Sequence, residues 1–149
     1  MSQVEVINNV FRSGFEQTAL AWIPWEEPGR FAVERYVLWA PQEPDEDSVG
    51  MLVRYPPGSH GDFHEHLGYE LMLVLDGRLD RSDGRFFGKG DLVVEAPGTR
   101  HQVSTSAGCT ILAIRTRPAL PCVPREGEII HEPWTFDQSS ERVTSLVES

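Results

Sequence analysis

Short apolar runs separated by turn residues dominate this chain of 149 residues. The runs typical of strands are residues 30–40, 49–55, 69–75, 91–96, 102–106 and 109–116, with shorter ones at 77–81 and 84–88. Prolines and glycines separate these runs, and the turn Ser82-Asp83-Gly84 indicates a hairpin. Many short strands with closely spaced turn signals are typical of an all-β sandwich or barrel. The sequence therefore predicts an all-β fold, with one short C-terminal helix over residues 139–149.

The chain is expected to form a single domain, because its length suits one hydrophobic core. The core barrel is predicted over residues 30–118. Residues 1–29 are interpreted as an N-terminal extension whose Trp22 and Trp25 pack against the barrel. Residues 119–149 then form a C-terminal segment of the same domain.

The net charge and the lack of targeting signals limit which classes of partner are expected. The formal net charge is −10, from 13 basic and 23 acidic residues. Such a surface repels nucleic acid and anionic membranes, so neither is an expected partner. No apolar run approaches the roughly 20 residues that span a bilayer, and the N-terminus carries no secretory signal. We therefore expect a cytoplasmic protein in which Cys109 and Cys122 are free thiols.

Histidines are concentrated in one stretch of the chain. Three of the five, His60, His64 and His66, fall within seven residues. Four residues after His66, Glu70 opens an otherwise apolar run, where an unpaired charge would be costly. Clustered histidines can form a solvated surface patch, but a carboxylate in an apolar strand needs a partner. The pattern therefore favours a site that includes Glu70.

The spacing requires a bend in the chain. In an extended strand His64, His66 and Glu70 share one face. A straight strand would hold Glu70 about 13 Å from His66, whereas the ligands of one metal ion each lie about 2 Å from it. We therefore expect a bend at residues 67–68, because Gly68 tolerates backbone conformations closed to other residues.

A fourth candidate ligand is His101, which follows the turn at 97–100 and opens a predicted strand. Three imidazoles and one carboxylate suit a divalent transition metal, and ligand softness alone allows Fe, Zn, Mn, Ni or Cu. The cation would also balance the charge of Glu70. We therefore predict one metal ion per chain, bound by His64, His66, Glu70 and His101.

The spacing of these residues resembles the cupin family. The first cupin motif, G-x5-HxH-x3-E-x6-G, is matched by Gly58, His64, His66, Glu70 and Gly77. The second, G-x5-PxG-x2-H-x3-N, is matched by Gly90, Gly98 and His101. Ala96 and Thr105 stand where this motif has proline and asparagine. Neither departure touches a predicted metal ligand.

Over residues 20–116 the sequence is more specifically similar to the ChrR-like cupin domains. This resemblance implies a double-stranded β-helix, the cupin jelly-roll barrel, with one metal ion held in its mouth. It also implies a homodimer. In ChrR the cupin follows a separate zinc-binding anti-sigma domain built on His and Cys ligands. This chain has no such motif, so a role in sequestering a sigma factor is not expected.

The strand over 69–75 is apolar on both alternating faces, so its outer face must also be covered. Either the N-terminal extension or a second subunit would do so. On the inner side, Met72, Val74 and Val103 share the parity of the ligands and predict a largely apolar pocket wall. Either Arg54 or Tyr55 should face this pocket, and the sequence leaves the choice open.

Three functions remain compatible with such a site. The first is an Fe-dependent dioxygenase acting on a chelating, oxygenated small molecule, and this is the one we favour. The second is a non-oxidative metal-dependent isomerase, dehydratase or lyase, for which Glu95, Tyr55 or His60 would have to serve as base. The third is a ChrR-like metal-binding sensor that is not an enzyme. His60 is the weaker candidate for the pocket, and His131 is interpreted as a surface or packing residue.

Overall fold

The computed structural model describes residues 3–43 and 46–128. Its strands are β1 Ile23–Pro24, β2 Glu34–Trp39, β3 Val49–Tyr55, β4 His64–His66, β5 Glu70–Arg81, β6 Phe86–Gly88, β7 Leu92–Glu95, β8 Arg100–His101, β9 Val103–Ser104, β10 Cys109–Arg115 and β11 Ala119–Pro121. The one helix in the described ranges is the 3₁₀ turn η1, Phe15–Gln17. No described helix is long and apolar enough to cross a membrane. The all-β prediction is confirmed, and the helix predicted over 139–149 lies outside the described residues.

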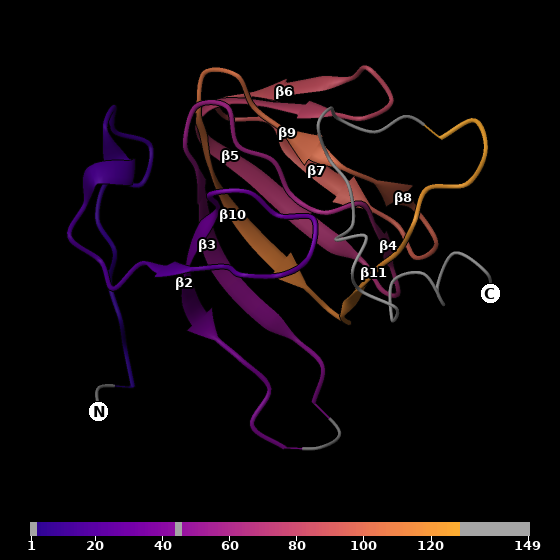
Figure 1. Ribbon diagram of the computed structural model, residues 1–149. Helices are drawn as coiled ribbons and strands as arrows, with labels where there is room; N and C mark the ends of the chain where they lie inside the picture. Colours follow the sequence, from indigo (N-terminus) through magenta and orange to yellow (C-terminus); the bar gives the residue numbers. More distant parts are fainter. Residues whose placement is uncertain (1–2, 44–45, 129–149) are drawn as a thin grey trace.

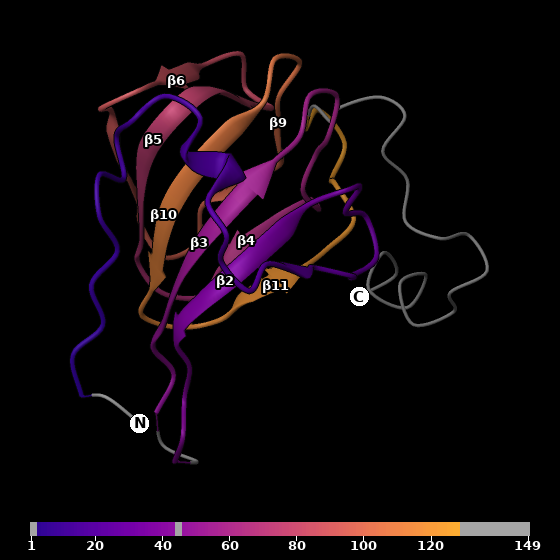
Figure 2. The ribbon, with the colours of Figure 1, turned by 90° about the vertical axis from the view of Figure 1, so that its left-hand side faces the viewer.

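The strands form two antiparallel sheets on opposite sides of a barrel. The larger sheet runs in the order β1-β2-β3-β10-β5-β6, with β7 and β9 also paired to β5, and the smaller sheet runs β11-β4-β8. Figure 1 shows β2, β3 and β10 on one side of the barrel and β4 and β11 on the other. Figure 2, turned by 90°, shows β3 and β10 side by side along the length of the larger sheet. This is the double-sheet jelly roll that the resemblance to cupins implied.

Strand β5 connects much of the larger sheet, because its 12 residues pair with β10 and β7 in the first half and with β6 and β9 in the second. The sequence predicted two strands here, over 69–75 and 77–81. The structure has one continuous strand through Gly77. This residue has a φ of +81°, and an added Cβ would stand 2.1 Å from the carbonyl oxygen of Gly108. Glycine is therefore required where β5 passes the start of β10.

Two apolar clusters occupy the two faces of the larger sheet. The inner cluster fills the barrel and contains Trp25, Val33, Met51, Val53, Tyr55, Met72, Val74, Leu79, Val103, Cys109, Ile111 and Ala113. On the outer face, Phe15 is buried against Leu52 and Leu75. Ile7, Val10, Leu20 and Trp22 surround it. The N-terminal segment thus packs on the outside of the sheet, while its Trp25 belongs to the inside.

The N-terminal segment leaves part of the outer face uncovered. Leu73 and Leu75 of β5 pack in the outer cluster, but Leu71, Val94 and Leu92 are 38%, 56% and 61% exposed. Leu71 lies directly opposite Val94 in the β5–β7 register. These three side chains form an apolar strip that the described part of this chain does not cover.

Candidate metal centre

Three strands bring the predicted ligands together. His64 of β4 lies directly opposite His101 of β8 in the antiparallel register. His66 is two residues further along β4 and therefore faces the same side, while Glu70 is the first residue of β5. All four side chains are buried. Their potential ligand atoms all lie within 4.8 Å of one another.

The bend between His66 and Glu70 falls where the sequence indicated, but Gly68 permits it for a different reason. Gly68 is absent from the glycines with positive φ. Instead, an added Cβ would stand 2.7 Å from Oγ1 of Thr116 and 2.8 Å from Cβ of Arg117. The expectation of an unusual backbone conformation at Gly68 is therefore wrong. Glycine is needed because the segment after β10 passes too close for a side chain.

The three imidazole rings converge through their Nε2 atoms. The Nε2–Nε2 distances are 3.2 Å between His64 and His66, 2.9 Å between His66 and His101, and 3.1 Å between His101 and His64. Two adjacent ligands, each about 2.1 Å from one ion and at right angles, are about 3.0 Å apart. The three nitrogens are therefore spaced as neighbouring ligands of a single metal ion.

Protonation also suits metal binding. Nδ1 of His64 lies 3.0 Å from the carbonyl oxygen of Asp62, so Nδ1 carries the proton and Nε2 presents a lone pair. Burial lowers the pKa of His66 to about 4 and holds the pKa of His101 well below its ordinary value. Neutral imidazoles are the form that binds metals. A cation between the three Nε2 atoms can accept a lone pair from each of them, so the residues present fit a divalent transition metal.

Each of the three histidines also has a carboxylate beside its other ring nitrogen. Nδ1 of His64 lies 3.3 Å from Oδ1 of Asp62, and Nδ1 of His66 lies 3.4 Å from Oε1 of Glu70. For His101 the nearest carboxylate oxygen is Oε2 of Glu95, at 3.8 Å, which is too long for a hydrogen bond. Carboxylates in this position orient metal-binding imidazoles and raise their basicity.

Each carboxylate is in turn paired with a buried arginine. Arg30 Nη2 lies 2.9 Å from Oδ1 of Asp62, and Arg115 Nε donates to Oε2 of Glu70 at 2.6 Å. Arg81 contacts both oxygens of Glu95, at 2.9 and 3.1 Å. Three triads, each made of a histidine, a carboxylate and an arginine, therefore surround the centre. In each triad the arginine comes from a different segment of the chain than the carboxylate.

Arg115 changes the interpretation of Glu70. From the sequence we predicted that a metal cation balances this carboxylate, but Arg115 already does so. Burial by itself would raise the pKa of Glu70, whereas Arg115 and the histidines hold it below its ordinary value. A signal for Arg115 existed, because it continues the inward-facing positions of Ile111 and Ala113 along β10. Nothing comparable pointed to Arg30 or Asp62.

The cavity beside the four ligands is very small. Its volume is about 10 Å³, which is the space of about one water molecule. Met72 and Val103 line it as predicted, while Val74 packs in the inner core. The expected apolar wall is therefore present in part, but the cavity at the four ligands is too small to hold a substrate.

Trp25 contributes to the wall of this cavity. Its ring lines the cavity together with His64, Glu70 and His101. The Arg30 guanidinium lies 3.5 Å from the Trp25 ring centroid, a cation–π distance. The loop between β1 and β2, which carries Trp25 and Arg30, crosses in front of the barrel in Figure 1. This loop covers the candidate centre.

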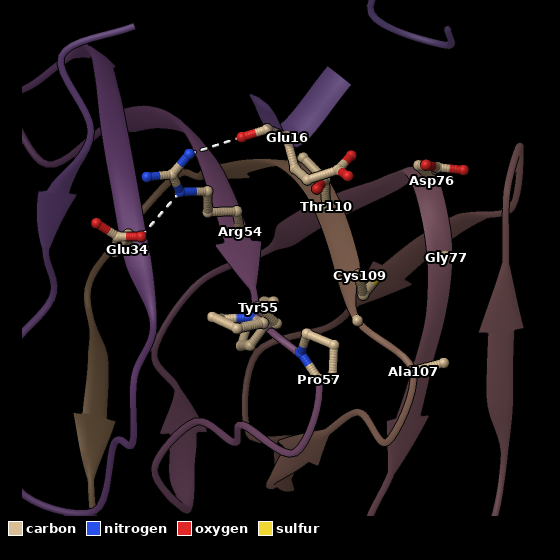
Figure 3. A pocket seen from close by; sticks show the side chains of 12 residues that line it. Glu16, Glu34, Arg54, Tyr55, Pro57, Asp76, Gly77, Ala107, Cys109 and Thr110 are labelled. Carbon is tan, nitrogen blue, oxygen red and sulfur yellow. Dashed lines mark hydrogen bonds and ion pairs between the residues drawn. The ribbon is translucent and has the colours of Figure 1, made fainter. Parts of the chain in front are cut away.

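The structure also decides between Arg54 and Tyr55. Tyr55 is buried and lines the cavity beside the ligands. Arg54 points to the outer side, where it donates to Oε1 of Glu34 at 2.9 Å and to the carbonyl oxygen of Glu16 at 2.6 Å (Figure 3). The outer cavity in Figure 3 has a volume of about 390 Å³ and shares only Tyr55 with the cavity at the candidate centre.

The other residues singled out in the sequence are neither ligands nor free bases in the described structure. His60 stacks on Phe31, with ring centroids 5.9 Å apart, and is not among the residues that line the inner cavity. Glu95 is held by Arg81 and is therefore not a free base. Thr105, in place of the motif's asparagine, donates to the carbonyl oxygen of Arg78 and accepts from the Gly108 amide, so it closes a turn. His131 is outside the described residues.

A comparison with models of protein families identifies the family of this chain. Residues 12–118, well over half of its length, match the model described as the ChrR cupin-like domain. The chain belongs to this family. The resemblance inferred from the two motifs is therefore confirmed. A search of curated proteins found no significant match.

Solved structures agree on the fold. A chain in the crystal structure of Rhodobacter sphaeroides SigE in complex with the anti-sigma ChrR is 26% identical, with a TM-score of 0.52, over 64% of this chain and 48% of that one. The alignment thus spans about half of that protein. The acetylacetone dioxygenase from Acinetobacter johnsonii is 15% identical, with a TM-score of 0.65, over 88% and 83% of the two chains. The polyketide cyclase RemF from Streptomyces resistomycificus is 18% identical, with a TM-score of 0.61, over 73% and 84%.

Proposed function

We propose that this chain binds one divalent transition metal ion through His64, His66, Glu70 and His101, and that it uses the ion as a dioxygenase of small chelating, oxygenated molecules. The observation that carries the proposal is the convergence of three Nε2 atoms to within 3.2 Å of one another. The acetylacetone dioxygenase among the structural neighbours supports the reaction type by analogy of fold alone.

The bound ion would supply Lewis acidity and open coordination positions for substrate oxygens. The chain's own residues would do the rest. Glu70 is the candidate proton acceptor, because Arg115 keeps it ionised. Burial raises the pKa of Tyr55 to about 12, so its hydroxyl stays protonated and serves as a hydrogen-bond donor. Met72 and Val103 keep water from the reacting groups.

Substrate entry requires movement of the covering loop. A cavity of about 10 Å³ cannot hold a diketone or a phenol. Trp25 and Arg30 come from a loop rather than from a central strand. Their displacement enlarges the cavity without breaking the pairing of β3, β5 and β10.

A metal-dependent sensor is the second candidate, and the closed interior favours it. A site that holds only a small ligand under a loop suits signalling by loop movement better than turnover of a bulky substrate. The ChrR neighbour is described as an anti-sigma in complex with SigE. A sigma factor is therefore the partner class to test for this candidate, although no anti-sigma motif was found in the sequence.

Metal content and oxygen uptake test the proposal together. Protein purified without added metal is analysed by ICP-MS, and the iron-loaded form is then placed in an oxygen electrode with β-diketones and catechol-like phenols. We expect oxygen uptake only when such a compound is present. Glu70→Gln should retain much of the iron and lose most turnover, whereas Glu65→Gln, on the other face of β4, should retain both.

Two results would replace the proposed reaction. Anaerobic isomerisation or dehydration without oxygen uptake would establish the non-oxidative enzyme. Stoichiometric zinc with no turnover, together with binding to a sigma factor, would establish the sensor. Absence of any bound transition metal would overturn all three.

A further inference from the structure

The charges around the candidate centre cancel before any metal binds. Asp62, Glu70 and Glu95 each carry one negative charge, and Arg30, Arg115 and Arg81 each pair with one of them. All six side chains are at most 12% exposed. The three histidines must be neutral to bind a metal. The protein therefore offers a divalent ion a shell with no net charge.

A divalent ion in this shell would keep its full positive charge inside a buried cavity. Buried charge without a counter-charge is costly. Carboxylate ligands normally reduce this charge, but here Arg115 compensates the Glu70 carboxylate first, at 2.6 Å. A neutral exogenous ligand would leave the excess unchanged, whereas an anion would reduce it.

Besides Nδ1 of the ligand His101, two buried donors near the cavity lack hydrogen-bond partners. Within the described part of the chain, neither Nε1 of Trp25 nor Nε of Arg35 has an acceptor. Trp25 lines the cavity with the metal ligands, and the Arg35 guanidinium lies 4.7 Å from its ring centroid. Orphaned buried donors are rare in folded proteins, so they point to an acceptor that the described residues do not supply.

We propose that the cavity beside the candidate centre is a carboxylate site, in which a small carboxylate is bound by the metal ion and by Nε1 of Trp25. This inference rests on the proposed metal binding and assigns the ligand class for the same site. A carboxylate offers two acceptor oxygens, one for each partner, and hydrogen bonds to charged acceptors are stronger than those to neutral ones. Because the closed cavity has room for about one water molecule, a carboxylate also requires movement of the covering loop, and formate and acetate require the least.

The test compares charged ligands with neutral ligands of the same shape. The Co²⁺-loaded protein, whose metal content is measured first, is titrated with formate and acetate, and separately with formamide and acetamide. Visible absorption of the cobalt centre reports binding without any requirement for turnover. We expect each carboxylate to bind at least about tenfold more tightly than its amide, and benzoate to bind more weakly than acetate.

Trp25→Phe removes the Nε1 donor together with part of the ring that lines the cavity, and the loss of the donor should weaken acetate binding by about tenfold. Trp22→Phe is the matched control, because the Trp22 indole donates to the Thr18 carbonyl on the outer face, and it should leave acetate binding unchanged. Equal affinities of acetate and acetamide for the wild-type protein would overturn this inference and leave metal binding intact. If cobalt does not bind, the proposed metal centre is overturned as well. If Trp25→Phe fails to fold, the comparison of acetate with acetamide on the wild-type protein still tests the carboxylate site.

Discussion

Arg115 and Glu70 face each other across the β10–β5 pair, with Nε of the arginine 2.6 Å from Oε2 of the glutamate. Glu70 is therefore ionised and compensated before any metal ion reaches the histidines. As a consequence, one side chain takes part in three interactions. Glu70 is at once a potential metal ligand, the carboxylate beside Nδ1 of His66, and one half of a buried ion pair.

Replacement of Arg115 tests this role. Arg115→Met leaves the Glu70 carboxylate buried without its arginine, so the free energy of unfolding of the metal-free protein should fall by about 3–5 kcal/mol. Zn²⁺ should then restore more stability to the variant than to the wild type, because the cation replaces the lost positive charge. Urea unfolding with and without Zn²⁺ measures both effects. Arg78→Met, at a more exposed ion pair, is the control and should cost less than about 1 kcal/mol. An Arg115→Met variant as stable as the wild type would refute the role of the pair.

Individual histidine replacements test the ligand set. His64→Ala, His66→Ala and His101→Ala should each lower metal content and remove the stabilisation that metal provides, since only the folded state forms the site. His60→Ala is the control for a buried histidine outside the cluster and should retain full metal content. ICP-MS after dialysis and thermal unfolding with added metal give the two readouts. Metal lost from His60→Ala, or retained by His101→Ala, would contradict the assigned ligands.

The metal-free protein should lose stability in mildly acidic solution. The pKa of His66 is about 4 in the folded state, below its ordinary value of 6.5, so the unfolded chain takes up this proton first as the pH falls. The stabilisation is therefore complete above about pH 6.5 and is lost as the pH approaches 4, by on the order of 3 kcal/mol. Burial shifts the pKa of His101 in the same direction. Urea unfolding of EDTA-treated protein at pH 7.5 and pH 5 measures the change. His66→Asn should reduce this pH dependence, and an unchanged midpoint in the wild type would disprove the assignment.

The uncovered strip on the outer face predicts self-association. Leu71, Val94 and Leu92 expose apolar surface next to the segment that the N-terminus covers, and a second copy would remove this surface from water. Analytical ultracentrifugation at micromolar concentration should give twice 16.8 kDa. Val94→Asp should shift the population to monomer, whereas Leu120→Asp, at an exposed leucine of β11 in the other sheet, should not. A monomeric wild-type protein would exclude the dimer.

Local pattern was sufficient for the strands that have strong apolar periodicity. Residues 49–55 form β3 as predicted, and 109–116 differ from β10 by a single residue. The short strands β1 and β11 were not predicted, because two or three residues carry no periodicity and pair only when a partner strand is already in place. Gly77 looked like a strand end in the sequence, yet only the approach of Gly108 determines its role.

The four candidate ligands were accessible from sequence because the spacing His64-x-His66-x3-Glu70 and the turn before His101 encode local geometry. The residues that surround these ligands could not be identified from the sequence in the same way. The partners of these residues, Asp62, Arg30, Arg115, Glu95 and Arg81, meet only when β4, β5, β7 and β10 and the covering loop have assembled. Apart from Arg115, which shares the parity of the inward-facing residues of β10, these partners leave no periodic trace in the sequence. The position of Trp25 was also not predictable from local pattern. The sequence indicated that Trp25 packs against the barrel, whereas in the structure it lies inside the barrel, because the loop between β1 and β2 folds over the cavity. The sequence therefore determined which atoms can bind a metal, while the tertiary structure decided the charge and the space around it.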